Sequence, residues 1–280
     1  MSTALPLGID VGGSGIKGAP VDLDKGEFAQ ERVRIDTPAE STPEAVCDII
    51  ARIVEQFDEV HDGSPIGVTV PGVVQHGVVK TAANIHKSWI NCEIEKLLED
   101  RLQHDVVVVN DADAAGVAEL AYGAAKGQDG LVIMTTLGTG IGTAVINRGV
   151  LVPNSELGHL EIDGVDAETV AASSIKTAEG LSYEEWAPRL QRYYRYLEDL
   201  MWPDLIVVGG GVSKKSDKFL PLLDLRTPIV PAVLRNAAGI IGAAVLANGD
   251  QQDRGRHPSR AAALRALSPG AARTWVRTVV

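Results

Sequence analysis

The stretch that decides the fold of this chain is LGIDVGGSGIKGA, residues 7–19. It contains Gly13-x-Gly15-x-x-Gly18, which matches the glycine spacing of a dinucleotide-binding loop. In that fold the loop opens a helix, because the helix N-terminus binds the pyrophosphate. Here the glycines are soon followed by Pro20, which disfavours a helix over its first turns. The sequence therefore predicts a glycine turn between two strands rather than a dinucleotide site.

We expect the two strands of this hairpin over residues 5–11 and 16–23, with the proline at an edge or a bulge. The same order of strand, glycine turn and strand returns in residues 131–151, where GTGI (138–141) lines up with GSGI at the first turn. A further apolar run, LIVVGGGVS (205–213), ends in three glycines. The repetition predicts two halves of related topology, each offering a glycine turn to one cleft.

Hydrophobic patterning predicts the remaining elements. Continuous apolar runs indicate buried strands over residues 65–74 and 106–110, and a hairpin is expected around Gly77. Thr42 and Pro43 are typical of a helix N-cap and of the first helical residue. Further helices are expected over residues 115–125, near 167–174, over 182–201 and over 238–247.

Composition bounds the class of protein. The 280 residues are 45% hydrophobic and 22% charged, and the net charge of −11 disfavours nonspecific binding of nucleic acid. No apolar run reaches the roughly 18 residues that span a membrane, and the first residues do not resemble a signal peptide. The two cysteines, Cys47 and Cys92, have no metal-ligand spacing and suit a reducing compartment. We therefore expect a cytoplasmic protein with no membrane and no nucleic-acid partner.

The C-terminal end differs from the rest of the chain. Residues 251–280 hold six arginines against one acid and are rich in alanine and proline. We predict that residues 249–280 form a basic, poorly ordered tail. The alternative is an electrostatic contact for an anionic partner.

The glycine turns are predicted to bind phosphate, because backbone N–H groups approach an anion closely where no Cβ intervenes. Lys17 adds a cation, and Thr136 and Thr139 add hydroxyl donors. Asp10 would repel a phosphate directly, but it suits a hydrated Mg²⁺ between carboxylate and phosphate. The alternative is that the glycines only make tight turns. The predicted phosphate-binding residues are Asp10, Gly12, Gly13, Ser14, Gly15, Lys17, Thr136, Gly138, Thr139, Gly140, Gly210 and Gly211.

Five stretches together carry a family resemblance: LGIDVGGSGIKG, NDADAAGVAE (110–119), TTLGTGIGTA (135–144), ELGHLEIDG (156–164) and VVGGGVS (207–213). In this order and spacing they resemble the ROK family of sugar kinases and regulators, and within it the polyphosphate-dependent glucokinases. The resemblance covers residues 5 to about 248. It implies an α/β fold of the actin-like ATPase (ribonuclease H-like) type, with two domains around a deep cleft.

The resemblance also implies where the domains divide. The N-terminal α/β domain would comprise residues 1–110 plus 237–248, because the final helix of the family packs back on it, and the C-terminal α/β domain residues 111–236. Many ROK proteins carry a cysteine-rich zinc motif after the ExGH element, but here IDGVDAETVAASS has no cysteine. We therefore expect no zinc, and Mg²⁺ only together with the phosphoryl donor.

Asn110 and Asp111 end a predicted buried strand, which is where ligand sites of α/β folds lie. Phosphorylation of a sugar hydroxyl needs a carboxylate that accepts or orients its proton. The resemblance implies that Asp111 is this base, near O6 of a hexose, and that Asn110 belongs to the same site. The alternative is that Asp111 caps the following helix, although Asp113 could do so instead.

Four more residues are implied to bind the sugar: Glu156, His159, Glu168 and Asn84, with His159 near the anomeric hydroxyl. Each has a plainer alternative. Glu-x-x-His also occurs in solvated turns and partial metal sites, Glu168 suits the first turn of a helix, and Asn84 suits a turn. Trp89 is expected to pack in the core rather than to stack on the sugar.

A polyphosphate donor would need cations along its path. The sequence offers Lys17, Lys87, Lys126, Arg148, Lys214, Lys215 and Lys218, three of them in SKKSDKF directly after the third glycine turn. Each one alone can equally be a solvated surface residue.

These observations predict a Mg²⁺-dependent kinase, a monomer or homodimer, that transfers a phosphoryl group from inorganic polyphosphate, ATP or both to the 6-hydroxyl of glucose. Mannose is left open as a second acceptor. One alternative is a ROK kinase that phosphorylates another sugar and uses ATP only. Another is a non-catalytic sugar sensor, which would need a DNA-binding domain before the ROK body, and here the glycine motif begins too close to Met1 to leave room for it.

Overall fold

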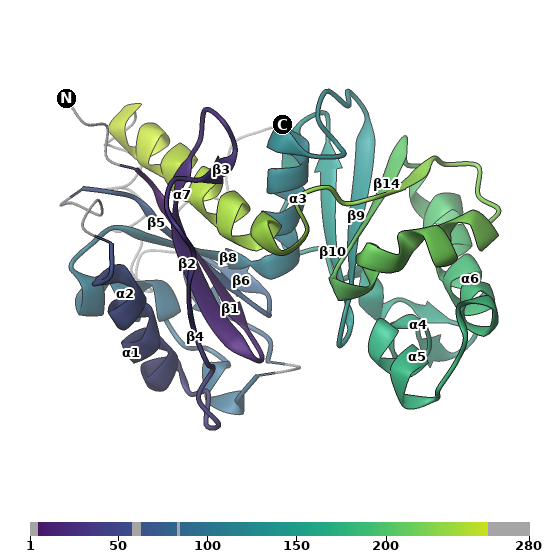
Figure 1. The fold of residues 1–280 in the computed structure, drawn as a ribbon, viewed down its shortest axis with the longest axis horizontal. Helices are drawn as coiled ribbons and strands as arrows, with labels where there is room; N and C mark the ends of the chain where they lie inside the picture. Colours follow the sequence, from purple (N-terminus) through teal and green to yellow (C-terminus); the bar gives the residue numbers. More distant parts are fainter. Residues whose placement is uncertain (1–4, 58–62, 83–84, 257–280) are drawn as a thin grey trace, which may run out of the picture.

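The computed structural model describes residues 5–57, 63–82 and 85–256. Two β-sheets stand side by side, and helices α3 (Asp111–Tyr122) and α7 (Ala238–Arg256) lie between them (Figure 1). The chain therefore has the mixed α/β architecture that its strand and helix pattern predicts.

The first sheet is built on the glycine hairpin. Strands β1 (Leu7–Gly12) and β2 (Gly15–Asp22) pair antiparallel, so the glycines connect two strands and open no helix. β1 pairs parallel with β5 (Ile66–Val70), which pairs parallel with β8 (Val106–Asn110). On the other side of β2 lie two short strands, β3 (Glu27–Phe28) and β4 (Val33–Ile35).

Pro20 is not on an edge strand, and this part of the prediction is wrong. It lies inside β2, opposite Leu7 of β1. On its other side β2 changes partner, from β4 beside residues 16–18 to β3 beside residues 21–22. A residue without an N–H fits this position, because neither partner strand needs a donor from it.

The second sheet repeats this plan. Strands β9 (Leu131–Leu137) and β10 (Ile141–Asn147) form an antiparallel hairpin around the second glycine turn. β9 pairs parallel with β14 (Leu205–Gly209), and β14 pairs parallel with β15 (Ile229–Pro231). β11 (Val150–Val152) extends the sheet beyond β10. The two halves therefore share the topology that the repeated glycine pattern predicts.

Helix α7 returns from the second half of the chain to the first sheet. A Cβ at Gly8 of β1 would overlap the carbonyl of Ile240, and a Cβ at Gly67 of β5 would overlap that of Ala243. Only glycine allows the helix to lie this close to the strands. The helix continues to Arg256, beyond its predicted end, and the rest of the predicted basic tail lies outside the described residues. The domain boundaries stay a prediction.

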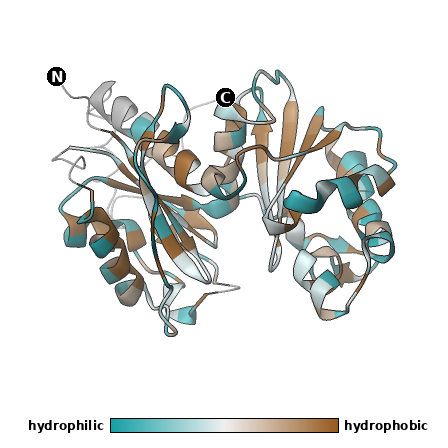
Figure 2. Cartoon of the chain, viewed as in Figure 1, coloured by the Kyte–Doolittle hydropathy of each residue, from teal (hydrophilic) through white to brown (hydrophobic). Residues whose placement is uncertain are grey.

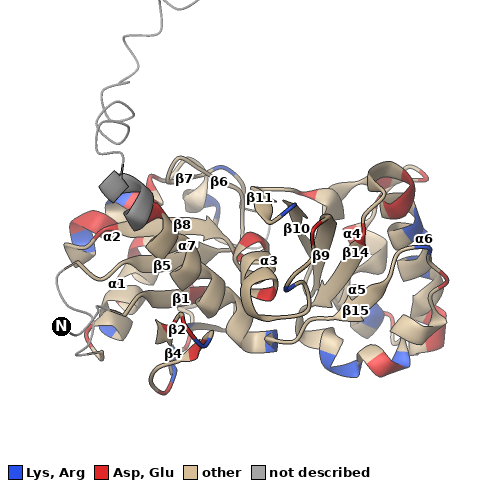
Figure 3. Ribbon diagram, turned by 90° about the horizontal axis from the view of Figure 1, so that it is seen from above, with Lys and Arg blue, Asp and Glu red and all other residues tan. Residues whose placement is uncertain are grey.

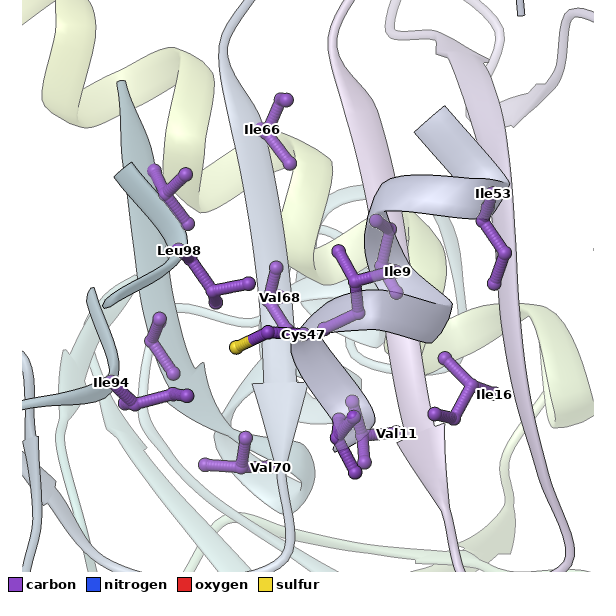
Figure 4. Close-up of a cluster of buried hydrophobic side chains, with 14 of the residues drawn as sticks. Ile9, Val11, Ile16, Cys47, Ile53, Ile66, Val68, Val70, Ile94 and Leu98 are labelled. Atoms are coloured by element: carbon purple, nitrogen blue, oxygen red, sulfur yellow. The ribbon is translucent and has the colours of Figure 1, made fainter. Parts of the chain in front are cut away.

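A hydrophobic core fills the space between the first sheet and helices α1 (Pro43–Val54) and α2 (Ile94–Leu102) (Figure 4). Thr42 caps α1, as predicted, by accepting the N–H of Ala45 at 3.3 Å. Trp89 is buried, and its Nε1 donates to the carbonyl of Ser41 at 2.7 Å. The prediction that this side chain packs in the core is confirmed.

A second core covers the outer face of the second sheet. Apolar side chains of β9 and β14 pack there against α6 (Tyr183–Met201), and Figure 2 shows hydrophobic strands with hydrophilic positions on the outer helices. The helix predicted near 167–174 is two helices, α4 (Glu168–Ala171) and α5 (Ser173–Ala178). The remaining elements are β6 (Val74–Gln75), β7 (Val78–Val79), β12 (Glu161–Ile162), β13 (Val165–Asp166), and 3₁₀ turns η1 (Lys87–Trp89), η2 (Leu157–His159), η3 (Gly211–Lys218), η4 (Leu220–Leu222) and η5 (Arg235–Ala237).

In the part of the chain that the structure describes, no helix combines the length and the apolar character needed to cross a bilayer.

Candidate active site

The first glycine turn joins β1 to β2 through Gly13 and Ser14. The hydroxyl of Thr37 donates to the carbonyl of Gly12 at 2.6 Å, and Nη2 of Arg34 donates to the carbonyl of Ser14 at 2.7 Å. In a planar trans peptide the N–H points away from the C=O, so the N–H of Gly13 faces away from Thr37. The turn can therefore present a backbone donor to an anion.

The second glycine turn is held in the same way. Ser173 and Ser174, at the start of α5, donate from their hydroxyls to the carbonyls of Gly138 at 3.0 Å and Thr139 at 2.6 Å. The N–H groups of Thr139 and Gly140 consequently point away from α5. Thr136 precedes this turn on β9 and is half-buried. Two serines thus orient the backbone of the loop that the sequence predicts to bind phosphate.

The third glycine turn packs on the second. Gly210 follows β14 with a φ of 81°, and a Cβ there would overlap the backbone of Leu137, which directly precedes Gly138. Gly211 then begins η3 (Gly211–Lys218). The positive φ and the close approach together explain why glycine stands at position 210.

Asp10 lies on β1 beside the first turn. Its Oδ1 accepts the hydroxyl proton of Thr69 at 3.0 Å, and its Oδ2 lies 3.4 Å from Nζ of Lys17. A Cβ at Gly239 would stand 3.1 Å from the same Oδ1, so the start of α7 borders the carboxylate. Sequence reasoning missed Thr69, which carries no signal beyond its place on a buried strand.

Asp111 begins α3 directly after β8. The N-cap is Asn110, whose Oδ1 accepts the N–H groups of Ala112 at 2.8 Å and Asp113 at 3.1 Å. Asp111 and Asp113 therefore do not cap this helix, and the alternative prediction that one of them is the N-cap is wrong. The amide of Asn110 also donates to the carbonyl of Gly72 at 3.1 Å, which fixes the end of β8. Asp111 lies in the first turn of the helix, and its Oδ1 accepts the N–H of Ala112 at 2.9 Å.

The surroundings of Asp111 favour its protonated form. Burial raises the pKa of Asp111 to about 6, and the negative charges of Asp10 and then Glu156 act in the same direction. Acidic positions lie on α3 between the two sheets in Figure 3. A carboxylate with a pKa near the working pH is well suited to accept a proton in catalysis.

His159 lies at the centre of an acidic cluster in the ELGH segment. Its Nδ1 lies 2.9 Å from Oδ2 of Asp166 and 3.9 Å from Oε1 of Glu168, and its Nε2 lies 3.8 Å from Oε2 of Glu156. The hydrogen bond to Asp166 raises the pKa of His159, while burial raises the pKa of Glu156. The structure thus brings together Glu156, His159 and Glu168, and it adds Asp166, which sequence reasoning missed because DGVDAE offers no spacing that distinguishes it.

Glu168 links this cluster to the second glycine turn. Its Oε2 accepts the N–H of Ile141 at 3.0 Å, and a Cβ at Gly140 would overlap the same carboxylate. It stands in the first turn of α4, so its plainer reading as a helix acid describes its position as well. The contact with Ile141 means that Glu168, which the sequence predicts to bind sugar, also supports the glycine turn that the sequence predicts to bind phosphate.

Asp113 is a second acid that sequence reasoning considered only as a helix cap. It is 2% exposed, its Oδ2 accepts the N–H of Asn154 at 2.7 Å, and its Oδ1 has no hydrogen-bond partner among the described residues. Burial raises the pKa of Asp113 to about 7, with further contributions from the charges of Glu156 and Asp111. Asp113 therefore connects the first turn of α3 to the segment that precedes ELGH.

The seven predicted donor cations are dispersed. Lys17 alone touches a predicted phosphate-site residue, Asp10, and Lys214 borders a cavity described below. Nζ of Lys218 lies 5.8 Å from the ring centre of Tyr183. The others, Lys87, Lys126, Arg148 and Lys215, are exposed.

Two predictions meet limits in the structure. Asn84 lies outside the described residues. Among the described residues, no three or more His, Cys, Asp and Glu side chains are grouped so that they could hold a metal ion. A Mg²⁺ that is bound mainly by phosphate oxygens and water needs only one or two carboxylates, and Asp10 is the one beside the first turn.

Comparison with known proteins gives this geometry a context. The sequence profile of the ROK family matches residues 6–171. A polyphosphate glucokinase of Mycobacterium tuberculosis (strain CDC 1551 / Oshkosh) is 51% identical over 245 residues, which cover 87% of this chain and 91% of that protein.

Two solved structures are also similar. The inorganic polyphosphate/ATP-glucomannokinase from Arthrobacter sp. strain KM is 54% identical with a TM-score of 0.85, over 89% of this chain and 100% of that chain. A ROK family glucokinase from Streptomyces griseus, solved in complex with glucose and AMPPNP, is 25% identical with a TM-score of 0.74, over 88% of this chain and 99% of that chain. Matches of this extent include both sheets and the helices between them.

Proposed function

The chain belongs to the ROK family, and we propose that it is a glucokinase that transfers a phosphoryl group from inorganic polyphosphate or ATP to the 6-hydroxyl of glucose. The family, the two-domain actin-like fold and the kinase class predicted from the sequence are confirmed by the similar proteins. The roles of individual residues below are proposals.

The observation that carries the proposal is the position of Asp111. Asp111 directly follows β8, which pairs with the strand that carries Thr69, the hydrogen-bond partner of Asp10. Two residues later, Asp113 accepts the N–H of Asn154, two residues before the ELGH segment. Asp111 therefore stands between a site for phosphate and a site for a polyol. Asp111 accepts the proton of the 6-hydroxyl as that oxygen bonds to the terminal phosphorus and the bond from phosphorus to the leaving phosphate breaks.

The acceptor is bound by the acidic cluster around His159. Glu156, His159 and Glu168 hold the hydroxyl groups of the hexose, Asn110 and Asn84 complete the site, and the bond between Asp166 and His159 orients the imidazole. Because Glu168 also accepts the N–H of Ile141, a bound sugar stabilises the second glycine turn. Mannose differs from glucose only at C2, and we include it as a second acceptor.

The donor phosphates are bound by the backbone N–H groups of the glycine turns and by Lys17. When bound with the donor, Mg²⁺ neutralises phosphate charge, and Asp10 is the residue that would hold it, directly or through water. Burial is the main cause that raises the pKa of Asp111, and repulsion by Asp10 adds to it. A cation beside Asp10 would relieve this repulsion, which supports the assignment. The two free cysteines support a cytoplasmic location, and we propose a monomer or homodimer.

The donor assay tests the proposal. Purified protein receives glucose and Mg²⁺ with either long-chain polyphosphate or ATP, and glucose 6-phosphate is measured. We expect turnover with both donors, loss of turnover with a chelator and recovery with added Mg²⁺. Turnover with ATP alone would contradict the polyphosphate donor, and turnover with neither would contradict the kinase.

A further inference from the structure

A cavity of about 570 Å³ lies between the two halves of the molecule, and Lys214, one of the predicted donor cations, lines it. One wall is formed by β3 and the loop after it, with Phe28, Glu31 and Arg32. The opposite wall is formed by Lys214 on η3 and by residues 234–237, which lead into α7. Its volume is in the range of ordinary ligand pockets.

The lining is cationic. Arg32, Lys214 and Arg235 face the cavity together with one acid, Glu31. Within the described residues none of these three cations forms an ion pair, whereas the nearby Arg34 pairs with Asp36 at 2.6 Å. The cavity has an excess of positive charge over the one acid, and among the described residues no ion pair occupies these three cations, so an anion that enters the cavity is attracted.

The backbone turns sharply at Arg235, on the wall of the cavity. Its φ of 52° lies in the left-handed region, which costs a residue with a Cβ about 1 kcal/mol. Here the conformation occurs at the exposed turn that directly precedes α7 and lines the cavity.

The wall formed by Lys214 and residues 234–237 continues into the proposed donor site. Ala237 lines the cavity, and Gly239, two residues further along, borders the carboxylate of Asp10. On the same wall Lys214 follows Gly211 within one 3₁₀ segment, directly after the third glycine turn. Asp10 in turn accepts the hydroxyl proton of Thr69 on β5, and β5 pairs with β8, which ends directly before Asp111, so the cavity lies on the donor side of the proposed reaction centre.

From this arrangement we propose that the cavity binds the distal phosphates of the polyphosphate donor, beyond those held by the glycine turns. The inference rests on the proposed polyphosphate-dependent activity. A linear polyphosphate carries a charge on every unit, so its chain continues to gain from cations outside the reaction centre. The nucleoside of ATP is uncharged and gains little from Arg32, Lys214 and Arg235, so the cavity distinguishes a long polyanion from a nucleotide.

The test compares three donors on purified full-length variants at saturating glucose. In Arg32→Gln/Arg235→Gln we expect the KM for long-chain polyphosphate to rise about tenfold, since two exposed cations are worth together about 1.4 kcal/mol. The KM for tripolyphosphate and for ATP should change less than about twofold, because tripolyphosphate is short and the nucleoside of ATP carries no charge. Glu31→Gln removes the one acid of the cavity and should lower the KM for long chains. Arg32→Lys keeps the charge and should stay close to the wild type.

Arg52→Gln provides the matched control, because it makes the same change at an exposed arginine of α1. An unchanged KM for long chains in the double variant would overturn the proposal, as would a rise for ATP alone, which would assign the cavity to the nucleoside. If the double variant misfolds, the single variants Glu31→Gln and Arg32→Lys provide the test. A KM for long-chain polyphosphate that rises in Glu31→Gln, instead of falling, would overturn the proposal. Failure of the wild type with every polyphosphate would instead refute the proposed donor, so the two failures are distinct.

Discussion

The side-chain amide of Asn154 makes two hydrogen bonds with the backbone of Val74: its Nδ2 donates to the carbonyl and its Oδ1 accepts the N–H, each at 2.8 Å. Val74 belongs to the β6–β7 hairpin beside the first sheet, whereas Asn154 follows the second-sheet hairpin, two residues before Glu156. The N–H of Asn154 in turn donates to Asp113 on α3. One residue therefore connects the first half of the chain, the helix of the proposed base and the segment that we propose binds the sugar.

Asn154→Leu should loosen this connection. The variant leaves the N–H and the carbonyl of buried Val74 without partners, and it forces a branched side chain into a backbone with a φ of 60°. We expect a loss of about 1–3 kcal/mol in the free energy of unfolding and a higher KM for glucose. Denaturant unfolding and initial-rate kinetics measure the two effects. Asn154→Gly tolerates the φ and isolates the loss of the hydrogen bonds, and a wild-type KM in both variants would contradict the positioning role.

Asp111→Asn should abolish turnover while leaving glucose binding largely intact. The amide cannot accept the hydroxyl proton, and loss of a general base costs about 10²–10⁴-fold in kcat. The change is nearly isosteric, and the carbonyl oxygen of the new amide can still accept the N–H of Ala112. Single-turnover kinetics and calorimetric titration with glucose separate the two properties. A variant that keeps most of its kcat would remove the assignment of the base.

The value of kcat/KM, which reports the enzyme before the donor and Mg²⁺ bind, should fall below about pH 6. The pKa of Asp111 is raised to about 6, so its ionised, proton-accepting form predominates only above that pH. The charge of Glu156 contributes to this shift, and Glu156→Gln should therefore move the acid limb of kcat/KM to lower pH even though the rate itself is reduced. The pH–rate profiles of the two proteins check the direction. An acid limb that moves to higher pH would contradict the electrostatic coupling.

Asp113→Asn should stabilise the protein above pH 7. Because the pKa of this buried acid is raised from 3.8 to about 7, the folded chain holds a proton that the unfolded chain releases. The stability of the wild type therefore falls as the pH rises from about 4 to about 7. The amide side chain of the variant does not titrate, so the variant loses this pH dependence of stability. The amide oxygen can still accept the N–H of Asn154, and the amide nitrogen occupies the place of Oδ1, which has no hydrogen-bond partner among the described residues of the wild type. Unfolding curves at pH 5 and pH 8 give the comparison, and equal pH dependence in both proteins would count against it.

Gly140→Ala should impair the donor and the sugar sites together. A Cβ at this position overlaps the carboxylate of Glu168, which must then leave the N–H of Ile141. We expect a higher KM for both substrates, measured with ATP and glucose varied in turn. Gly249→Ala is the control, because a Cβ there meets nothing within 4 Å and alanine favours a helix. An effect on the donor alone would show that Glu168 does not couple the two sites.

Much of the fold follows from local patterns in the chain. The hairpins around the first two glycine turns, the Thr42 cap of α1 and the helix after Ser182 are all decided by residues close together in sequence. Their chemistry is local too: a turn needs glycine, a helix start needs a side-chain acceptor, and a strand needs apolar residues on its buried faces. The mistaken edge position of Pro20 arose because β2 changes partner beside it, which no local pattern indicates.

The sequence by itself therefore determined the secondary structure around the glycine turns, the family, and the acids and histidine that carry the proposed chemistry. Only the tertiary structure decided that Asn110 rather than either aspartate caps α3, that Asp166 orients His159, that Asn154 joins the two halves, and that Arg32, Lys214 and Arg235 meet around one cavity. The reason is physical. Hydrogen bonds and charge interactions act between atoms a few ångströms apart, and only the packing of α7 and of the two sheets decides which distant residues reach that range.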